Sequence, residues 1–437
     1  MRNLTLLTDF YELTMMNGYL KEGIADNEAC FDVFYRGGNK LEYAMCAGLE
    51  QVVDYVNNLH FDKEDLDYLD GLNVFGKEFI ERLKNFKFTG DIYAVPEGTI
   101  IFPYEPILTI KAPLFEAQLL ETAILCVLNH QTLIATKAAR LCQNTDAKIM
   151  EFGLRRAQGP DAGIYGARAA YIGGCRSTSN VLAGQMFGIP VKGTHAHSWV
   201  MSFPDELTAF RAYAELYPEG CMLLVDTYDT LKSGVPNAIK VFDELKQKGY
   251  KPLGIRLDSG DLAYLSKEAR KMLDDAGHSD CIICVSNDID EQVLLSLKAQ
   301  DAKIDLFGIG TRLITSYDAP SLGGVYKLCA IEENGKLVLK KDKIDTDKPL
   351  TIFHPQYPWK KTTFEKYSVR ELMVTVFKGG KQVYKLPSLE EIAKYAASQI
   401  NDDDFVFIDA GTTTFLMTKY ITAYRATYVT NGIAHAK

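Results

Sequence analysis

The sequence lacks an excess of positive charge, a long apolar run and an apolar N-terminus, which would indicate a nucleic-acid-binding, a membrane-spanning or a secreted protein, respectively. Positive charge is in deficit, with 48 Lys and Arg against 57 Asp and Glu and a net charge of −9, which argues against broad contact with nucleic acid or an anionic membrane. No apolar run reaches the length of about 18 residues that a membrane-spanning helix needs. Asp9 and Glu12 interrupt the N-terminal stretch where a signal peptide would be apolar, so we expect a cytoplasmic protein.

Cysteine and histidine are also sparse. The nine cysteines have no framework spacing, which argues against a disulfide-stapled fold and fits a reducing compartment. The C-x-x-C pair of Cys281 and Cys284 lies in a strand-like run, where residues three apart point to opposite faces, so we interpret both as packing residues rather than metal ligands. Only seven histidines occur, and two of them, His195 and His197, share the short stretch GTHAH.

What the sequence does contain is an alternation of short β-rich runs with amphipathic helical stretches, starting near residue 148. This alternation predicts parallel strands with helical crossovers, and a (β/α) barrel explains it best. In such a barrel the functional groups stand at the carboxyl ends of the strands, which is where the polar residues of these runs fall. The six runs span residues 148–156, 189–197, 221–229, 252–261, 281–290 and 304–312.

The rest of the chain predicts an α/β accessory domain. A helix near the N-terminus precedes an alternating stretch broken by prolines, 90–110, which indicates antiparallel strands, and a long buried helix or helix pair follows. Strands after residue 323 return to this domain, and Gly379-Gly380 predicts a hairpin turn. We expect the accessory domain over 1–140, a catalytic barrel over 141–322, the return over 323–398 and an atypical tail over 399–437.

Strand ends that share one rim would gather cations, backbone donors and carboxylates. Cations and N–H groups hold phosphate, whereas carboxylates hold a hard metal ion or sugar hydroxyls. The rim therefore predicts a site for a polyanionic, hydroxylated substrate. Its members are Arg155, Arg156, Thr194, His195, His197, Asp226, Arg256, Asp258, Asp261, Asn287, Asp288, Gly308, Gly310 and Thr311.

Two turns of this rim each allow a second interpretation. GIGT, at 308–311, follows the last run, where barrels commonly hold a phosphate, but a plain tight turn would show the same pattern. In RLDSGD, Asp258 and Asp261 flank a Ser-Gly turn and can both reach the rim, and Asp261 is also placed to cap the next helix.

The histidines of GTHAH would permit a two-His metal site if the strand continued that far. No cysteine or third histidine is placed to complete a zinc site, and the nearby carboxylates favour Mg²⁺, which avoids imidazole. A neutral imidazole in an anion pocket is a competent base or phosphoryl acceptor, which is the interpretation we prefer.

These residues belong to a longer series of motifs. The series covers roughly 4–330 and resumes at ELMVTVFKGGKQVYKL; it includes LLTDFYELTM, FTGDIYAVPEGT, EFGLRRAQGPDA, GIPVKGTHAHSWV, LLVDTYDTLKSG, GIRLDSGDLAYLS and FGIGTRLITS. With it the chain resembles the nicotinate phosphoribosyltransferases, a type II phosphoribosyltransferase family. The resemblance implies an irregular (β/α) barrel of that kind, a homodimer with shared active sites, and formation of nicotinate mononucleotide from nicotinate and phosphoribosyl pyrophosphate in NAD salvage.

The resemblance also implies catalytic roles. His197, the histidine before Ser in Gly-Thr-x-Ala-His-Ser, would be phosphorylated transiently and couple ATP hydrolysis to the reaction, whereas His195 occupies the variable position and packs or tunes. Asp258, also counted as catalytic, would hold ribose hydroxyls or Mg²⁺ together with Asp261.

Substrate binding is implied residue by residue. Tyr11 of a neighbouring subunit and Phe152 would sandwich the pyridine ring, and Arg256 would bind its carboxylate. The remaining substrate-binding residues are Arg155 near the pyrophosphate, Thr194 at nicotinate, Ser259 and Gly260 in the DSGD turn, and Gly308, Gly310 and Thr311 at the 5′-phosphate.

Two segments depart from the family pattern. The stretch near 339–350 is shorter than in the family, and the tail from about 400 resembles the sensor domain of DeoR-type regulators, with a Gly-Thr-Thr-Thr turn at 411–414. We prefer a tail without function over a small regulatory phosphate site there. The alternative functions are a nicotinamide- or quinolinate-using relative and a non-catalytic sensor of phosphoribosyl compounds.

Overall fold

The computed structural model describes residues 3–37, 41–340, 352–354, 357–362, 372–397, 405–408 and 427–430. The chain divides into two compact units, unit 1 with residues 1–136 and 319–437, and unit 2 with residues 137–318. Within the described ranges, no helix combines the length and the apolarity that crossing a membrane requires. Residues 341–350 of the shortened segment near 339–350, and the turn at 411–414, lie outside the described residues.

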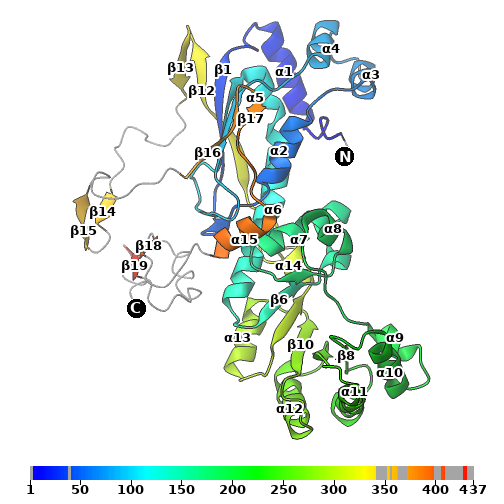
Figure 1. The fold of residues 1–437 in the computed structure, drawn as a ribbon. Helices are drawn as coiled ribbons and strands as arrows, with labels where there is room; N and C mark the ends of the chain where they lie inside the picture. The colour runs from blue at the N-terminus through cyan, green and yellow to red at the C-terminus, as the bar shows by residue number, and fades with distance from the viewer. Residues whose placement is uncertain are drawn as a thin grey trace. The chain divides into compact units, whose positions relative to one another are not determined.

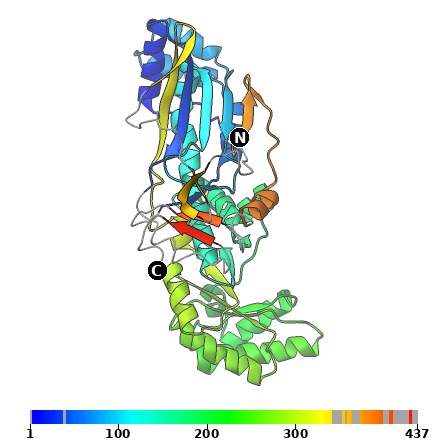
Figure 2. The ribbon, with the colours of Figure 1, turned by 90° about the vertical axis from the view of Figure 1, so that its left-hand side faces the viewer.

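Unit 1 is built on a seven-stranded sheet of order β13-β12-β1-β5-β3-β16-β17 whose neighbours pair antiparallel. Figure 2 shows the yellow β12 beside the blue β1. The predicted return of the chain is confirmed, because β12 pairs with β1 and β16 pairs with β3. The antiparallel β3 and β5 and the hairpin at Gly379-Gly380 are confirmed as well.

Alternate side chains of this sheet point to the face that packs against helices. Along β1 every second residue, Ala29, Phe31, Val33 and Tyr35, is buried, and the same pattern runs along β5. These side chains share one apolar cluster with residues of α2 and α6. The predicted helix pair is confirmed as α5 and α6: all six residues of α5 are buried, and Ala123, Ile124, Leu128 and Leu133 of α6 belong to this cluster.

The elements of unit 1 are α1 (Phe10–Lys21), β1 (Glu28–Tyr35), β2 (Ala44–Met45), α2 (Leu49–Asn57), α3 (Lys63–Gly71), α4 (Lys77–Lys84), β3 (Asp91–Ala94), β4 (Ile100–Ile101), β5 (Leu108–Pro113), α5 (Leu114–Leu119), α6 (Glu121–Gln143, which continues into unit 2), β12 (Gly324–Glu333), β13 (Lys336–Leu339), β14 (Ile352–His354), β15 (Tyr357–Thr362), β16 (Val374–Lys378), β17 (Lys381–Gln382), α15 (Leu389–Ala397), β18 (Phe405–Ile408) and β19 (Thr427–Thr430).

The elements of unit 2 are β6 (Lys148–Glu151), the short helix η1 (Leu154–Arg156), α7 (Pro160–Ile172), β7 (Ser177–Thr178), α8 (Val181–Phe187), α9 (His197–Met201), α10 (Glu206–Leu216), β8 (Met222–Leu224), the helical turn η2 (Thr230–Gly234), α11 (Val235–Gln247), β9 (Gly254–Leu257), α12 (Leu262–Asp275), β10 (Ile282–Asn287), α13 (Glu291–Ala299), β11 (Leu306–Ile309) and α14 (Thr311–Ile314).

Unit 2 confirms the predicted parallel α/β arrangement. Six strands form one sheet of order β7-β6-β11-β10-β9-β8, and each neighbouring pair is parallel (Figure 1). Between residues 137 and 318, all of which are described, no strand pairing joins the two edge strands, β7 and β8. Closure of the sheet into a barrel therefore stays a prediction, whereas the α/β class is confirmed.

The run at 189–197 does not form the strand that its composition predicts. Only Val191 makes an isolated parallel bridge, to Thr178 of β7, and α9 begins at His197. Thr178 N–H donates to Pro190 O at 3.1 Å and Lys192 N–H donates to Thr178 O at 3.0 Å. Pro190 has no N–H with which to extend this ladder toward residue 189, and on the other side β7 ends at Thr178, because Asn180 caps α8.

Side-chain caps fix the residues at which four helices of unit 2 begin. Asn180, Asp205, Asp261 and Asp290 each accept a hydrogen bond from a backbone N–H in the first turn of α8, α10, α12 and α13, respectively. A cap of this kind stabilises a helix by about 1 kcal/mol. Asn180, Asp261 and Asp290 end the loops that follow β7, β9 and β10, whereas Asp205 caps α10 after α9.

Candidate active site

Unit 2 brings together all of the predicted site residues except Tyr11. They lie at or just after the carboxyl ends of β6, β8, β9, β10 and β11, or in the loop that joins β7 to α9. Tyr11 belongs to α1 of unit 1, where burial and a hydrogen bond with Glu121 raise the pKa of its phenol. The geometry below therefore concerns unit 2.

Arg256, on β9, is held by three side chains, one on β10, one in the loop before α9 and one directly after β9 itself. Its Nε donates to Ser286 Oγ at 2.7 Å, its Nη1 to Thr194 Oγ1 at 2.8 Å, and its Nη2 to Asp258 Oδ1 at 2.8 Å. The side chain is only 13% exposed, so the guanidinium is fixed in one orientation. Each terminal nitrogen makes one of these hydrogen bonds and so keeps a second N–H, and guanidinium N–H groups are suited to binding a carboxylate.

The Phe152 ring lies beside this guanidinium, with Arg256 Cζ 5.6 Å from the ring centroid. Phe152 follows β6, and its N–H donates to Ile309 O at 2.8 Å. A Cβ atom at Gly308 would stand 2.5 Å from Phe152 Cδ2, so only glycine lets the ring lie against β11. A flat aromatic face next to a fixed cation suits a planar, negatively charged ligand.

Asp258 and His197 face each other at this site. His197 Nε2 lies 3.7 Å from Asp258 Oδ2, and His197 Nδ1 is hydrogen-bonded to Thr227 Oγ1 at 3.1 Å. Burial alone would raise the pKa of Asp258, but the hydroxyl of Ser286 and the charge of Arg256 outweigh it and lower the pKa below its ordinary value. Asp258 is therefore an anion at neutral pH, close to an imidazole that is 39% exposed.

The DSGD turn is tied to β8 through Asp226. Asp226 Oδ2 accepts hydrogen bonds from Asp258 N–H at 2.7 Å and from Ser259 Oγ at 2.6 Å. Gly260 has φ +80°, a conformation that side chains other than glycine rarely adopt. The turn is therefore a rigid element, with Asp226 as its support.

The two predicted magnesium ligands, Asp258 and Asp261, both have hydrogen-bond partners. Asp261 Oδ1 accepts from Tyr264 N–H at 3.0 Å, so the predicted capping role is present. Asp226 Oδ1 is buried and has no hydrogen-bond partner, which leaves an acceptor for a cation beside Asp258. In the described part of the chain no group of three or more His, Cys, Asp or Glu residues has the arrangement of a complete metal site. These oxygens fit an ion that is held mainly by substrate phosphates.

The predicted phosphate side is formed by separate turns. Gly310 precedes α14, and a Cβ atom there would lie 3.2 Å from Phe152 O; Thr311 is the first residue of that short helix. Asp288 of the rim accepts from Arg312 at 2.9 Å, so this carboxylate holds the turn in place. Arg155 is exposed on η1, and no described carboxylate pairs with it in the ion pairs of the chain.

Three supporting residues were not predicted as members of the site. Ser286 bridges Arg256 and Asp258, Thr227 orients His197, and Glu151 accepts from Thr178 Oγ1 at 2.6 Å beneath the Phe152 turn. Ser286 precedes the Asn287 and Asp288 that were assigned to the rim, and Thr227 follows Asp226. Arg256 and Asp258 are two residues apart, and this spacing could have suggested that their side chains lie on the same side of the strand. The supporting residues contact them from other strands, and a single sequence does not show such contacts.

The two cysteines of the C-x-x-C pair are packing residues, as predicted. Cys281 and Cys284 are free and buried, and burial raises the pKa of their thiols to about 11 and about 12, respectively.

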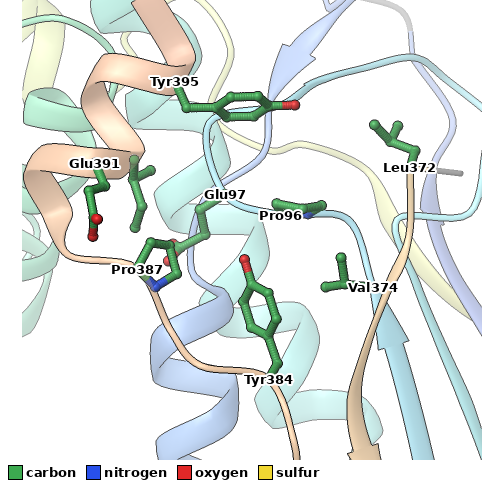
Figure 3. Close-up of a pocket in the computed structure, with 9 residues that line it drawn as sticks. Pro96, Glu97, Leu372, Val374, Tyr384, Pro387, Glu391 and Tyr395 are labelled. Atoms are coloured by element: carbon green, nitrogen blue, oxygen red, sulfur yellow. The ribbon is translucent and has the colours of Figure 1, made fainter. Parts of the chain in front are cut away.

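A cavity of about 390 Å³ lies elsewhere, in unit 1 (Figure 3). Its lining has two glutamates and no lysine or arginine, so it cannot neutralise a pyrophosphate. The strand ends of unit 2, not this cavity, fit the predicted substrate. The lining residues are Pro96, Glu97, Leu372, Val374, Tyr384, Pro387, Glu391, Ile392 and Tyr395.

Comparison with known families gives three matches along the chain. The model of the nicotinate phosphoribosyltransferase N-terminal domain matches residues 6–129, and that of its C-terminal domain matches residues 335–402. The model of the DeoR C terminal sensor domain matches residues 388–437, which confirms the resemblance of the tail.

Similar proteins cover nearly the whole chain. The nicotinate phosphoribosyltransferase of Bacillus subtilis is 43% identical over 91% of this chain and 89% of its own. The crystal structure of human nicotinic acid phosphoribosyltransferase is similar with a TM-score of 0.76 and 29% identity, over 98% of each chain. The nicotinate-nucleotide pyrophosphorylase of Pyrococcus furiosus shares the fold, with a TM-score of 0.70 at 23% identity over 91% of this chain and 95% of its own. The chain belongs to the nicotinate phosphoribosyltransferase family.

Proposed function

We propose that this protein joins the ring nitrogen of nicotinate to the ribosyl C1 of phosphoribosyl pyrophosphate, in the cytoplasm, as a step of NAD salvage. The C1–oxygen bond to pyrophosphate breaks, its electron pair leaves with the pyrophosphate, and nicotinate mononucleotide is formed. The observation that carries this proposal is the fixed Arg256 guanidinium beside the Phe152 ring, with one unused N–H on each terminal nitrogen. Nine free cysteines support a reducing compartment.

Selectivity for nicotinate follows from this pair. The carboxylate of nicotinate would accept both unused N–H groups of Arg256, whereas nicotinamide offers one acceptor and one donor that would face a donor. Quinolinate carries a second carboxylate, which the neighbouring Asp258 anion would repel. Tyr11 would cover the opposite face of the pyridine ring from a second subunit of a homodimer.

Bond breaking leaves positive charge on the sugar and negative charge on the leaving group. The Asp258 carboxylate is ionised and fixed by Arg256 and Ser286, so it can stabilise the positive sugar and orient its hydroxyls. Arg155 would face the pyrophosphate, and Thr311 with Gly308 and Gly310 would bind the 5′-phosphate. Asp258 and Asp261 would hold Mg²⁺ together with substrate oxygens, and the ion would neutralise charge on the pyrophosphate.

ATP coupling would run through His197. Its imidazole is accessible at the edge of the site and is oriented by Thr227, as a phosphoryl acceptor must be. A phosphoryl group on His197 would place new negative charge opposite Asp258 and rearrange how cations and loops are held there. Turnover would then be linked to ATP hydrolysis.

The test measures formation of nicotinate mononucleotide and pyrophosphate from nicotinate, phosphoribosyl pyrophosphate, ATP and Mg²⁺, with nicotinamide and quinolinate in parallel. We expect turnover of nicotinate alone among the three, stimulation by ATP, and loss of that stimulation in His197→Ala. Absence of turnover with nicotinate would refute the proposal, and full stimulation in His197→Ala would refute the coupling.

The match of residues 388–437 to a sensor domain supports one second candidate, a non-catalytic sensor of phosphoribosyl compounds. Binding of phosphoribosyl pyrophosphate without turnover of any of the three pyridines would favour it over the enzyme.

A further inference from the structure

We propose that His195 is the positioning residue that fixes the GTHAH loop, residues 191–197, by inserting its imidazole between α10 and the edge of β8. This inference deepens the proposed function, because the loop carries Thr194 and His197. His195 itself contacts neither Arg256 nor Asp258 through its side chain in the hydrogen bonds of the site.

Burial singles out His195 within the loop. It is 8% exposed and is the one buried residue between Val191 and His197, whereas Val191, Lys192, Gly193 and Ala196 are exposed. The ring packs edge-on against Tyr213 at 4.7 Å between centroids and lies 6.1 Å from Phe210, both on α10. Within residues 191–197, packing in the interior of unit 2 therefore depends on the His195 side chain.

The His195 ring also accepts a hydrogen bond from the backbone of β8. Leu224 N–H, in β8, donates to His195 Nε2 at 3.2 Å. The next N–H, that of Val225, donates to Arg256 O on the side of β9, so the N–H of Leu224 points to the opposite, unpaired edge of the sheet. His195 therefore satisfies a buried backbone donor that a neighbouring strand would otherwise satisfy.

The protonation state of the ring suits this role. Because Leu224 N–H donates to Nε2, the proton of the neutral ring is on Nδ1, and this N–H points to Ala196 O at 3.4 Å. Burial lowers the pKa of His195 to about 4, with the charge of Arg256 acting in the same direction, so the imidazole stays neutral at neutral pH.

The loop thus contacts both edges of the sheet of unit 2. On one side Pro190 and Lys192 bond to Thr178 of β7 through the backbone, and on the other side the His195 side chain bonds to Leu224 of β8. The His195 side chain thus holds the loop to the β8 edge, as backbone hydrogen bonds hold it to the β7 edge.

Thr194 and His197 depend on this anchorage. Thr194 Oγ1 accepts from Arg256 Nη1 at 2.8 Å and donates to His195 O at 3.1 Å, and His197 reaches Thr227 two residues further on. If the His195 ring leaves its place, neither contact keeps its geometry. His195 therefore acts on nicotinate binding and on phosphorylation of His197 without touching a substrate.

The test compares three substitutions that separate the hydrogen bond from the packing. The amide of glutamine reaches the position of Nε2, whereas the amide of asparagine reaches only that of Nδ1, and phenylalanine keeps an aromatic ring without an acceptor. His278→Phe is the matched control, because His278 is a second fully buried histidine of unit 2, bonded to Asp243 at 2.9 Å and far from the loop in sequence.

We expect His195→Asn and His195→Phe to raise the KM for nicotinate and to lower the yield of phosphohistidine by about five- to ten-fold, the worth of one buried hydrogen bond. His195→Gln, which keeps an acceptor at the position of Nε2, should restore both readouts. His278→Phe should lower Tm as much as His195→Phe does, with an unchanged KM.

A second readout does not depend on activity. Hydrogen exchange of the segment 190–201 should speed up in His195→Asn and His195→Phe, and not in His195→Gln or His278→Phe. Equal KM values and equal exchange for the Gln and Asn variants would overturn the proposal. If the wild type does not turn over nicotinate, the proposed function fails, and exchange alone then decides whether His195 anchors the loop.

Discussion

At the scale of single residues, the five-residue motif GTHAH places two imidazoles in opposite environments. His195 is buried and neutral against a backbone donor, whereas His197 is 39% exposed and stands between a hydroxyl and a carboxylate. Sequence alone predicted that the two differ, because only His197 fits the family motif. It could not predict what His195 contacts, since Leu224 lies on another strand and is an ordinary apolar residue in the sequence.

Glu12, on α1, gives a prediction about pH at this scale. Burial raises the pKa of its carboxyl from 4.5 to about 7, although the hydroxyls of Thr122 and Thr8 act against the rise. Because the folded pKa lies above the unfolded one, this group stabilises the fold fully below pH 4.5, and the contribution is lost as pH rises through 7. The loss amounts to about 3 kcal/mol at pH 8.

We therefore expect Tm of the wild type to fall, relative to Glu12→Gln, between pH 5 and pH 8. Thermal unfolding over that range measures it, with Glu78→Gln, at an exposed glutamate in the first turn of α4, as the control. Parallel Tm curves for the wild type and both variants would contradict the assignment.

At the scale of elements, the sequence predicted the parallel sheet of unit 2 and the antiparallel sheet of unit 1, because each pattern repeats over many residues. It was wrong for 189–197, where Pro190 on one side and the end of β7 on the other limit pairing to one bridge, and it did not detect β7, which is only two residues long. Arg256, Asp258 and Thr194 were predicted for one site and are in contact there. Ser286, which bridges Arg256 and Asp258, and Thr227, which orients His197, carry no signal of their own in the sequence.

The contact between β11 and the turn after β6 gives a prediction about Gly308. In Gly308→Ala the new Cβ would overlap Phe152 Cδ2, which stands 2.5 Å away, so the ring must leave its place beside Arg256. We expect a rise of about ten-fold in the KM for nicotinate and a loss of about 1 to 3 kcal/mol in unfolding free energy. Steady-state kinetics and urea unfolding measure the two effects.

Gly71→Ala is the control for this substitution. Gly71 closes α3, and a Cβ there meets no atom within 4 Å, so its stability should stay within about 0.5 kcal/mol of the wild type or rise. An unchanged KM in Gly308→Ala would show that the position of the Phe152 ring does not matter for nicotinate.

At the scale of the whole molecule, two family matches overlap on one helix. The match to the nicotinate phosphoribosyltransferase C-terminal domain ends at 402, and the match to the DeoR sensor domain begins at 388, so both include α15. The packing assigns α15 to unit 1, because Ile392 and Ala396 are buried, at 2% and 6% exposure. A Cβ at Gly98 would stand 2.9 Å from Ile392 O, so the helix lies directly on that turn.

Two truncations separate the helix from the sensor-like tail. Deleting 401–437 leaves α15 and the cavity that it lines, and we expect unchanged Tm and unchanged turnover of nicotinate. Deleting 388–437 also removes the buried Ile392 and Ala396, and we expect a loss of about 2 to 4 kcal/mol in unfolding free energy. Urea unfolding of both variants, with turnover measured in the presence and absence of inorganic phosphate, provides the comparison. A changed response to phosphate in the shorter deletion, compared with the wild type, would show that the tail is regulatory. Equal stability, turnover and phosphate response of the shorter deletion and the wild type would show that the residues before 401 suffice for the fold and that the tail has no role in catalysis.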